Sequence, residues 1–311
     1  MKLSYIKCHG SGNEFVMIDA VGAQLQGVEL AALSRFVCSR DLGTGADGLL
    51  LLCERNGLYG MRMFNPDGSE AEMCGNGIRC VARLADERGY CSEEFDMWSG
   101  ANIYHIAREE DIYPQLPTYG VTLGVRLKGE SFGFMEGDEF IAEMIPALHK
   151  ELRWTAIDVG NPHIVAEVEE IDYDLLESLG RRVTELHEEF PRGVNISLVV
   201  RTGKNRIFVA TYERGAGITA SCGTAMTSSA TAMALRGRCD YGVTIDVENR
   251  GGMVRCVCYK EGGFATRLIG NATYMAYGNI ELEGERLSMV ERGEYCDEVA
   301  LYDEFANRFK A

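Results

Sequence analysis

The chain has 311 residues, of which 46% are hydrophobic and 25% charged, and its formal net charge at pH 7 is −16. This composition is typical of a folded globular protein with one large or two medium domains, and excludes a disordered or fibrous chain. The negative charge, without clusters of Lys and Arg, argues against nucleic acid and anionic membranes as partners.

The N-terminal segment and the cysteines indicate the cellular compartment. MKLSYIKCHGSGNEF lacks the apolar core of a signal peptide, and no stretch approaches the roughly 20 apolar residues of a membrane span. We therefore expect a cytoplasmic protein without a membrane partner. The eleven cysteines are an odd number and suggest reduced, mostly buried thiols. No CxxC spacing occurs, which argues against a metal site and weakens the alternative of a thiol–disulfide redox enzyme.

The first half of the chain predicts strands and helices in a mixed order. After a Gly-Asn turn come an expected strand at 16–19, an amphipathic helix at 31–40 and apolar strands at 49–52 and 60–64. A polar, glycine-containing loop over 65–73 leads to Cys74 and Gly75. We expect a helix over 76–88, which Gly89 ends with a left-handed cap.

The second half repeats this series at an offset of 148 residues, the separation of Cys74 and Cys222. The same offset relates 12–13 to 160–161, 45–52 to 193–200, 64–65 to 212–213, and Gly89 to Gly237. The corresponding strands are expected at 164–167, 196–200 and 206–212, and the helices at 175–183 and 224–236. Five matches at one offset predict an internal duplication.

A loop over 111–120 with two prolines marks the expected border between the halves. We place one domain at 1–117, joined by the C-terminal strand and tail at 276–311, and the other at 118–275. From about Leu287 the chain has no counterpart in the first half, and its charged end, YDEFANRFKA, is expected to be an extra helix without an assigned role.

The two Cys-Gly pairs at helix starts suggest a chemistry. A thiol at the positive end of a helix has its pKa lowered from about 8.5 toward neutrality and can act as acid or base. The free N–H groups of the first turn bind a carboxylate, and glycine permits close approach. If the two copies face each other, one thiolate removes an α-proton and the other thiol returns a proton to the opposite face. Taken alone, each cysteine is more simply a buried packing residue.

Other polar residues have simpler explanations beside the functional one. Asparagines next to glycines, prolines or strand ends are common turn formers, and the same caution covers His163 and Thr224. Glu213 and Arg214 could bind an ammonium and a carboxylate, or form a solvated salt bridge.

Six segments resemble, in order and over residues 1–283, the signatures of the diaminopimelate epimerase family. They are KCHGSGNEFVMID, GTGADGLL, FNPDGSEAEMCGNGIRCVAR, DVGNPHIV, PRGVNISLV and YERGAGITASCGTA. The resemblance implies an α/β (α+β) fold of two pseudo-symmetric domains. Each would be a curved mixed sheet around a central helix, with the active site at their interface. It also implies a two-base epimerase without a cofactor or metal.

The resemblance implies a role for each matching residue. Cys74 and Cys222 would be the acid/base pair. The reacting carboxylate would bind the N–H groups of Gly75, Asn76, Gly223 and Thr224, with Asn13 nearby. The distal end of the substrate would be held by Asn65, Asn161, Asn195 and Arg214, with Glu213 taking its ammonium and His163 lining the site.

The sequence departs from the family pattern at Ile218 and Ala225, which lie near the second catalytic turn and could reshape the pocket. The leading interpretation is conversion of LL- to meso-diaminopimelate for lysine and peptidoglycan synthesis. The alternatives are a racemase of another amino acid, such as histidine or lysine, and a non-catalytic amino-acid binding protein. The sequence leaves open whether the chain forms a homodimer.

Overall fold

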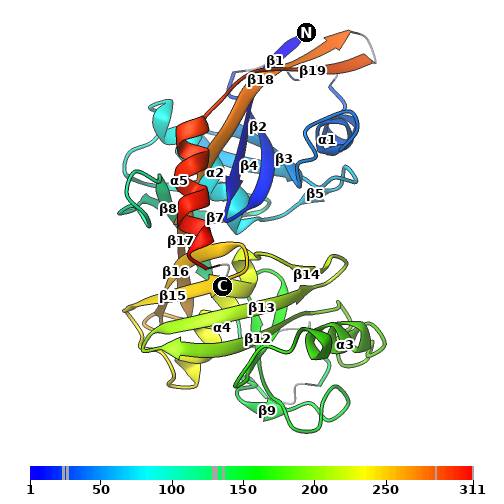
Figure 1. Ribbon diagram of the computed structural model, residues 1–311, viewed down its shortest axis with the longest axis vertical. Coiled ribbons are helices and arrows are strands. Elements are labelled where there is room, and N and C mark those ends of the chain that lie inside the picture. The colour runs from blue at the N-terminus through cyan, green and yellow to red at the C-terminus, as the bar shows by residue number, and fades with distance from the viewer. Residues whose placement is uncertain (23–24, 26–27, 128–131, 135–136, 284–285, 310–311) are drawn as a thin grey trace. The chain divides into compact units, whose positions relative to one another are not determined.

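A computed structural model describes residues 1–22, 25, 28–127, 132–134, 137–283 and 286–309. The chain divides into two compact units: Met1–Val121 with Ile269–Asn307 form unit 1, and Thr122–Leu268 forms the body of unit 2. Strands β8 (Thr118–Gly124) and β17 (Ala265–Asn271) carry the chain from one unit to the other (Figure 1).

Unit 1 is built on a mixed sheet. Its elements are β1 (Lys2–Gly10), β2 (Asn13–Asp19), α1 (Leu30–Cys38), β3 (Gly48–Arg55), β4 (Leu58–Phe64), β5 (Glu70–Ala71), α2 (Gly75–Glu87), β6 (Glu94–Ser99), β7 (Asn102–Arg108), β18 (Thr273–Glu283), β19 (Arg286–Glu294) and α5 (Cys296–Asn307). Strand β2 pairs with β1 antiparallel and with β3 parallel. Strand β4 pairs with β3 antiparallel and with β6 parallel.

Unit 2 repeats this arrangement. Its elements are β9 (Glu143–Met144), β10 (Arg153–Asp158), β11 (Pro162–Glu167), α3 (Tyr173–Val183), β12 (Asn195–Gly203), β13 (Arg206–Glu213), β14 (Gly217–Thr219), α4 (Gly223–Leu235), β15 (Thr244–Asn249) and β16 (Gly252–Tyr259). Strand β11 pairs with β10 antiparallel and with β12 parallel, and β13 pairs with β12 antiparallel and with β15 parallel. The mixed α/β fold expected from the sequence is confirmed.

Helices α2 and α4 end in the same way. Gly89 and Gly237 have φ values of +71° and +69°, the left-handed region expected of a glycine cap. Just beyond the glycines, Tyr90 N donates to Ala85 O at 2.9 Å and Arg238 N donates to Met233 O at 2.8 Å. Both helix ends therefore satisfy a terminal carbonyl through the same geometry.

The run of four leucines in β3 is apolar throughout because the strand is covered on both faces. Leu49 and Leu51 pack with Leu33 and Val37 of α1. Leu50 lies on the other face against α2, where a Cβ on Gly77 would come within 2.9 Å of its Cδ2. Gly77 thus allows α2 to approach the sheet closely.

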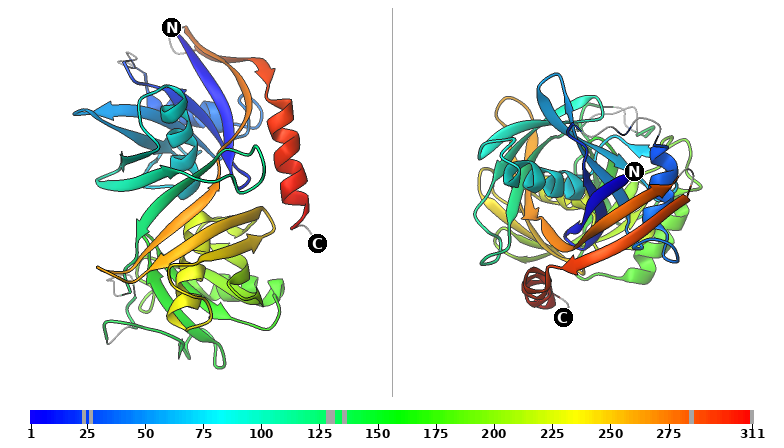
Figure 2. Two further views of the ribbon diagram at one scale, coloured as in Figure 1. Left: turned by 90° about the vertical axis from the view of Figure 1, so that its left-hand side faces the viewer. Right: turned by 90° about the horizontal axis from the view of Figure 1, so that it is seen from above.

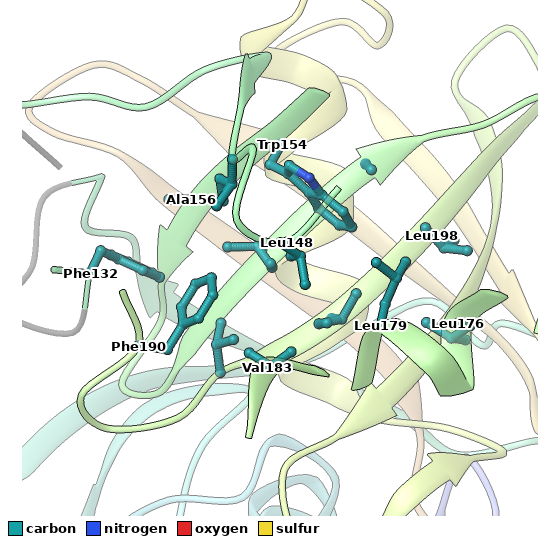
Figure 3. Close-up of a cluster of buried hydrophobic side chains, with 14 of the residues drawn as sticks. Phe132, Leu148, Trp154, Ala156, Leu176, Leu179, Val183, Phe190 and Leu198 are labelled. Atoms are coloured by element: carbon teal, nitrogen blue, oxygen red, sulfur yellow. The ribbon is translucent and has the colours of Figure 1, made fainter. Parts of the chain in front are cut away.

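The core of unit 2 lies between α3 and its sheet. Leu176, Leu179 and Val183 of α3 pack with Trp154 of β10 and Leu198 of β12 (Figure 3). Trp154 is fully buried. The spacing of the helical residues places them on one face, which explains why this short helix docks against the sheet.

The C-terminal segment adds two elements to unit 1. Strand β18 pairs with β1 antiparallel, and β19, which the sequence reading missed, pairs with β18. Helix α5, the terminal helix expected from the sequence, follows β19 and packs against β18 (Figure 2). Within the described ranges, no helix is long and apolar enough to cross a membrane.

Candidate active site

Cys74 is the N-cap of α2 in unit 1. Its backbone is extended, with φ −142° and ψ 114°, and its Sγ accepts a hydrogen bond from Gly77 N at 3.4 Å. The side chain is half-buried, whereas Gly75 and Asn76 are buried. Gly10 of β1 permits this arrangement, because a Cβ there would lie 2.8 Å from Asn76 O. The start of α2 therefore lies directly against β1.

The β1–β2 turn presents Asn13 to this helix start. Ser11 and Gly12 both adopt positive φ, which turns the chain tightly between the two strands. The Oδ1 atom of Asn13 lies 3.9 Å from Cys74 Sγ and 3.4 Å from Asn76 Nδ2. Its Nδ2 donates to Asp47 Oδ2 at 2.8 Å. We call Asn13, Asp47, Cys74 and Asn76 the first half-site; Asp47 was not among the residues singled out from the sequence.

A buried arginine stabilises the first half-site through hydrogen bonds. Arg79 is 0% exposed and donates to Gly75 O at 2.9 Å, and to Asn76 Oδ1 and Ser11 Oγ at 3.1 Å each. It thereby links the helix start to the turn that carries Asn13. The sequence reading missed Arg79, because its burial and its contact with the turn at Ser11 are not visible in the local sequence.

Asn65, the remaining predicted asparagine of unit 1, forms its hydrogen bonds with residues other than Asn13 and Cys74. It follows β4, where its Nδ2 donates to Ser69 Oγ at 3.0 Å and its carbonyl accepts from Ser34 Oγ at 2.8 Å. Among the described residues, no hydrogen bond joins it to Asn13 or Cys74. Its half-buried side chain ends a strand at the loop that leads to the cysteine.

Unit 2 builds the corresponding arrangement around Cys222, the N-cap of α4. The Cys222 Sγ lies 3.4 Å from Thr224 Oγ1, and Asn161 Nδ2 donates to the same hydroxyl at 3.3 Å. Asn161 and Thr224 occupy the positions of Asn13 and Asn76 at the 148-residue offset. In both units, an asparagine from the Gly-Asn turn contacts the residue two places after the cysteine.

His163 joins two of the predicted asparagines. Its Nε2 lies 3.1 Å from Asn161 Oδ1 and 3.4 Å from Asn195 Nδ2. The ring is fully buried, and burial, against the opposing charge of Asp158 and with a smaller effect from the Arg214 charge, lowers its pKa to about 3. His163 is therefore a neutral ring, and at the shorter of the two distances its Nε2–H donates to Asn161 Oδ1 and orients Asn161. We call Asn161, His163, Asn195, Cys222 and Thr224 the second half-site.

Glu213 ends β13 beside this half-site, and Arg214 follows it. The Arg214 N–H donates to Asn195 Oδ1 at 2.9 Å, and its exposed guanidinium donates to the carbonyl of Arg192. The Glu213 carboxylate accepts a hydrogen bond from Thr219 Oγ1. The two charges thus bond to different partners, unlike the solvated salt bridge considered from the sequence.

The two departures from the family pattern lie in different surroundings. Ile218 of β14 pairs with Tyr212 in the sheet and is 37% exposed. Ala225 is fully buried in α4, and its N–H group faces the Cys222 sulfur.

Both thiols have raised pKa values, which corrects the expectation that the helix starts lower them. For Cys74, burial outweighs the N–H groups of Gly77 and Asn76 and the charge of Arg79, all of which favour the thiolate. For Cys222, burial and the negative charge of Glu213 raise the pKa well above its usual range. For both thiolates, the free-energy cost of desolvation exceeds the stabilisation that the helix N-terminus provides.

The fold resembles those of several solved structures. A hydroxyproline epimerase from Agrobacterium vitis superposes with a TM-score of 0.62 at 14% identity, over 91% of this chain and 94% of that one. A Bacillus anthracis phenazine biosynthesis protein of the PhzF family gives 0.66 at 15% identity, over 91% and 100%. These likenesses define the fold class.

Sequence comparison identifies the family. The family model described as diaminopimelate epimerase matches residues 5–110 and 155–275. Proteins named diaminopimelate epimerase from Clostridium acetobutylicum and Lactiplantibacillus plantarum are 33% and 36% identical, over 98% and 100% of this chain and 94% and 100% of theirs. The chain belongs to the diaminopimelate epimerase family, an isomerase family, and the resemblance seen in the motifs is confirmed.

Proposed function

We propose that this protein converts LL-diaminopimelate to meso-diaminopimelate with Cys74 and Cys222 as its two acid/base groups. One observation carries the proposal: each duplicated unit places a half-buried cysteine at the start of a buried helix, with an asparagine of a Gly-Asn turn against that start. Neither packing nor helix propensity requires a cysteine at both N-caps, where Ser, Thr, Asp and Asn are preferred.

The proton balance needs the two thiols in opposite states. One thiolate takes the α-proton and becomes a thiol, and the other thiol gives its proton to the opposite face of the carbanion and becomes a thiolate. Because a raised pKa makes a thiolate a stronger base, burial favours removal of a weakly acidic α-proton. Arg79 and the N–H groups at the start of α2 favour the Cys74 thiolate, whereas Glu213 favours the protonated Cys222. We assign Cys74 as the base of the first turnover.

The backbone N–H groups at both helix starts, at Gly75, Asn76, Gly223 and Thr224, would hold the reacting carboxylate and stabilise the enolate-like charge. The distal end of the substrate carries a second carboxylate and ammonium. Its proposed ligands are Asn65, Asn161, Asn195, Arg214 and Glu213. His163 would act through Asn161, to which it donates a hydrogen bond, and through its contact with Asn195.

The proposal places the reaction in the cytoplasm, in lysine and peptidoglycan synthesis, with a small amino-acid substrate as the partner. Proton NMR in D2O tests the substrate: reduced enzyme is incubated separately with LL-diaminopimelate, histidine and lysine. We expect the α-proton signal to disappear for diaminopimelate alone. Exchange confined to histidine or lysine would assign another substrate, and absence of exchange with all three would favour an amino-acid binding protein.

A further inference from the structure

The C-terminal helix α5 is docked firmly on unit 1, although the duplication supplies no equivalent in unit 2. Glu298 pairs with the buried guanidinium of Arg83 and accepts from Tyr274 N at 2.9 Å. Further along, Phe305 is buried against the ring of Tyr113, with ring centroids 5.6 Å apart. These contacts fix the helix at both ends and leave the residue between them, Tyr302, facing the unit.

Tyr302 packs on a histidine of strand β1. Its ring centroid lies 4.2 Å from that of His9, with the rings at 67° in an edge-to-face arrangement. Both side chains are buried, at 7% and 4% exposure. Such a contact restricts the His9 ring to one orientation.

His9 in turn holds the tight turn between β1 and β2. Its Nδ1 accepts a hydrogen bond from Gly12 N at 3.2 Å. Asn271 completes the support, because its Oδ1 accepts from Ser11 N at 2.9 Å and its Nδ2 lies 3.4 Å from His9 Nδ1. Burial and the charges of Arg79 and Lys7 lower the His9 pKa to about 3, so Nδ1 stays an acceptor near neutral pH.

This turn ends at Asn13, whose Oδ1 lies against Cys74 and Asn76. A continuous series of contacts thus runs from α5 through Tyr302, His9 and the Ser11–Gly12 turn to the first half-site. We propose that Tyr302 is a positioning residue for the Cys74 half-site, which it orders through His9 and the turn. The catalytic meaning of this role rests on the proposed function.

The second half-site obtains its support differently. Its Asn161 is oriented by His163, which lies inside unit 2. The inference therefore predicts an asymmetric effect: a change at Tyr302 alters Cys74 and leaves Cys222 as an internal reference.

Selective alkylation of the two cysteines tests the inference without a substrate. Reduced protein is treated with a limiting amount of iodoacetamide, and modification at Cys74 and Cys222 is followed by mass spectrometry. For Tyr302→Ala we expect Cys74 to react roughly fivefold faster, because a loosened turn exposes its sulfur, while Cys222 keeps its rate. Tyr302→Phe keeps the ring on His9 and should restore the wild-type rate.

Tyr295→Ala is the matched control, since it removes a tyrosine ring at the start of the same helix, where that ring packs on Tyr274 and Tyr277. Equal acceleration in this variant, equal acceleration at both cysteines, or failure of Tyr302→Phe to restore the rate would overturn the inference. Should Tyr302→Ala not fold, Tyr302→Leu fills the space without the ring and is read in the same way. An enzyme inactive on diaminopimelate whose Cys74 still responds to Tyr302 would refute the proposed function alone. An active enzyme whose Cys74 ignores Tyr302 would refute the inference alone.

Discussion

The two buried histidines make each unit sensitive to acid. His9 in unit 1 and His163 in unit 2 have pKa values lowered to about 3, chiefly by burial, whereas an unfolded histidine titrates near pH 6.5. Below about pH 6.5 the histidine is protonated in the unfolded chain but stays neutral in the folded unit, so the free energy of unfolding falls as pH falls. The free energy of unfolding therefore has its full value above about pH 6.5 and decreases progressively toward pH 3.

The loss can be worked out from these values. With the folded ring neutral throughout, titration of the unfolded histidine between pH 7 and pH 5 removes about 2 kcal/mol from the unfolding free energy of each unit. Unperturbed carboxylates titrate near pH 4, below this range, so the histidines are expected to dominate the slope.

The two tryptophans permit a separate assay for each unit. Trp98 lies in unit 1 and Trp154 in unit 2, and both are buried. Urea unfolding of Trp154→Phe, followed by fluorescence, reports unit 1, and Trp98→Phe reports unit 2. His9→Gln should flatten the pH dependence of unit 1 alone. A loss below about 0.5 kcal/mol between pH 7 and pH 5, or an unchanged slope in His9→Gln, would refute the reasoning.

Three further predictions concern single contacts. Gly237→Ala should destabilise unit 2 by about 1 kcal/mol in the same urea assay, because alanine is strained at φ +69°; no loss would contradict the cap. Glu213→Gln should move the pH profile of Cys222 alkylation to lower pH, because it removes a charge that raises that pKa; a shift at Cys74 instead would contradict this cause. Glu298→Gln should destabilise unit 1 by about 3 kcal/mol, since it leaves the Arg83 charge buried; a loss below about 1 kcal/mol would show that Glu87 suffices.

The fold was largely predictable because most of its signals are local. The glycines at 89 and 237 indicate helix ends and the leucines of β3 a buried strand from local sequence alone. The 148-residue repeat, the one signal that is not local, then gives the same order of elements in both halves. Strand β19 was missed although Leu287 and Met289 alternate with more exposed residues, because its charged sequence has no counterpart in the first half and its partner is the neighbouring β18.

The site was predictable only in part. The positions of the motifs predicted that Asn13, Cys74 and Asn76 lie close together, and likewise Asn161 and Thr224. The structure shows these contacts. The roles of Arg79 and His9 depend on burial and on contacts with turns and a C-terminal helix, which no local pattern encodes. The raised pKa values of the two thiols could not be predicted for the same reason. A helix start can be recognised in the local sequence, whereas desolvation depends on how the whole unit packs.

The central claim is that two thiols share the reaction, and single-cysteine substitution tests it most directly. Epimerisation of LL-diaminopimelate is measured for Cys74→Ala, Cys222→Ala and the control Cys296→Ala, which removes an exposed thiol on α5. We predict that the first two lose roughly 10²- to 10⁴-fold in kcat with their fold intact, and that the control retains its activity. Turnover within about tenfold of wild type in either Cys74→Ala or Cys222→Ala would contradict the two-thiol mechanism.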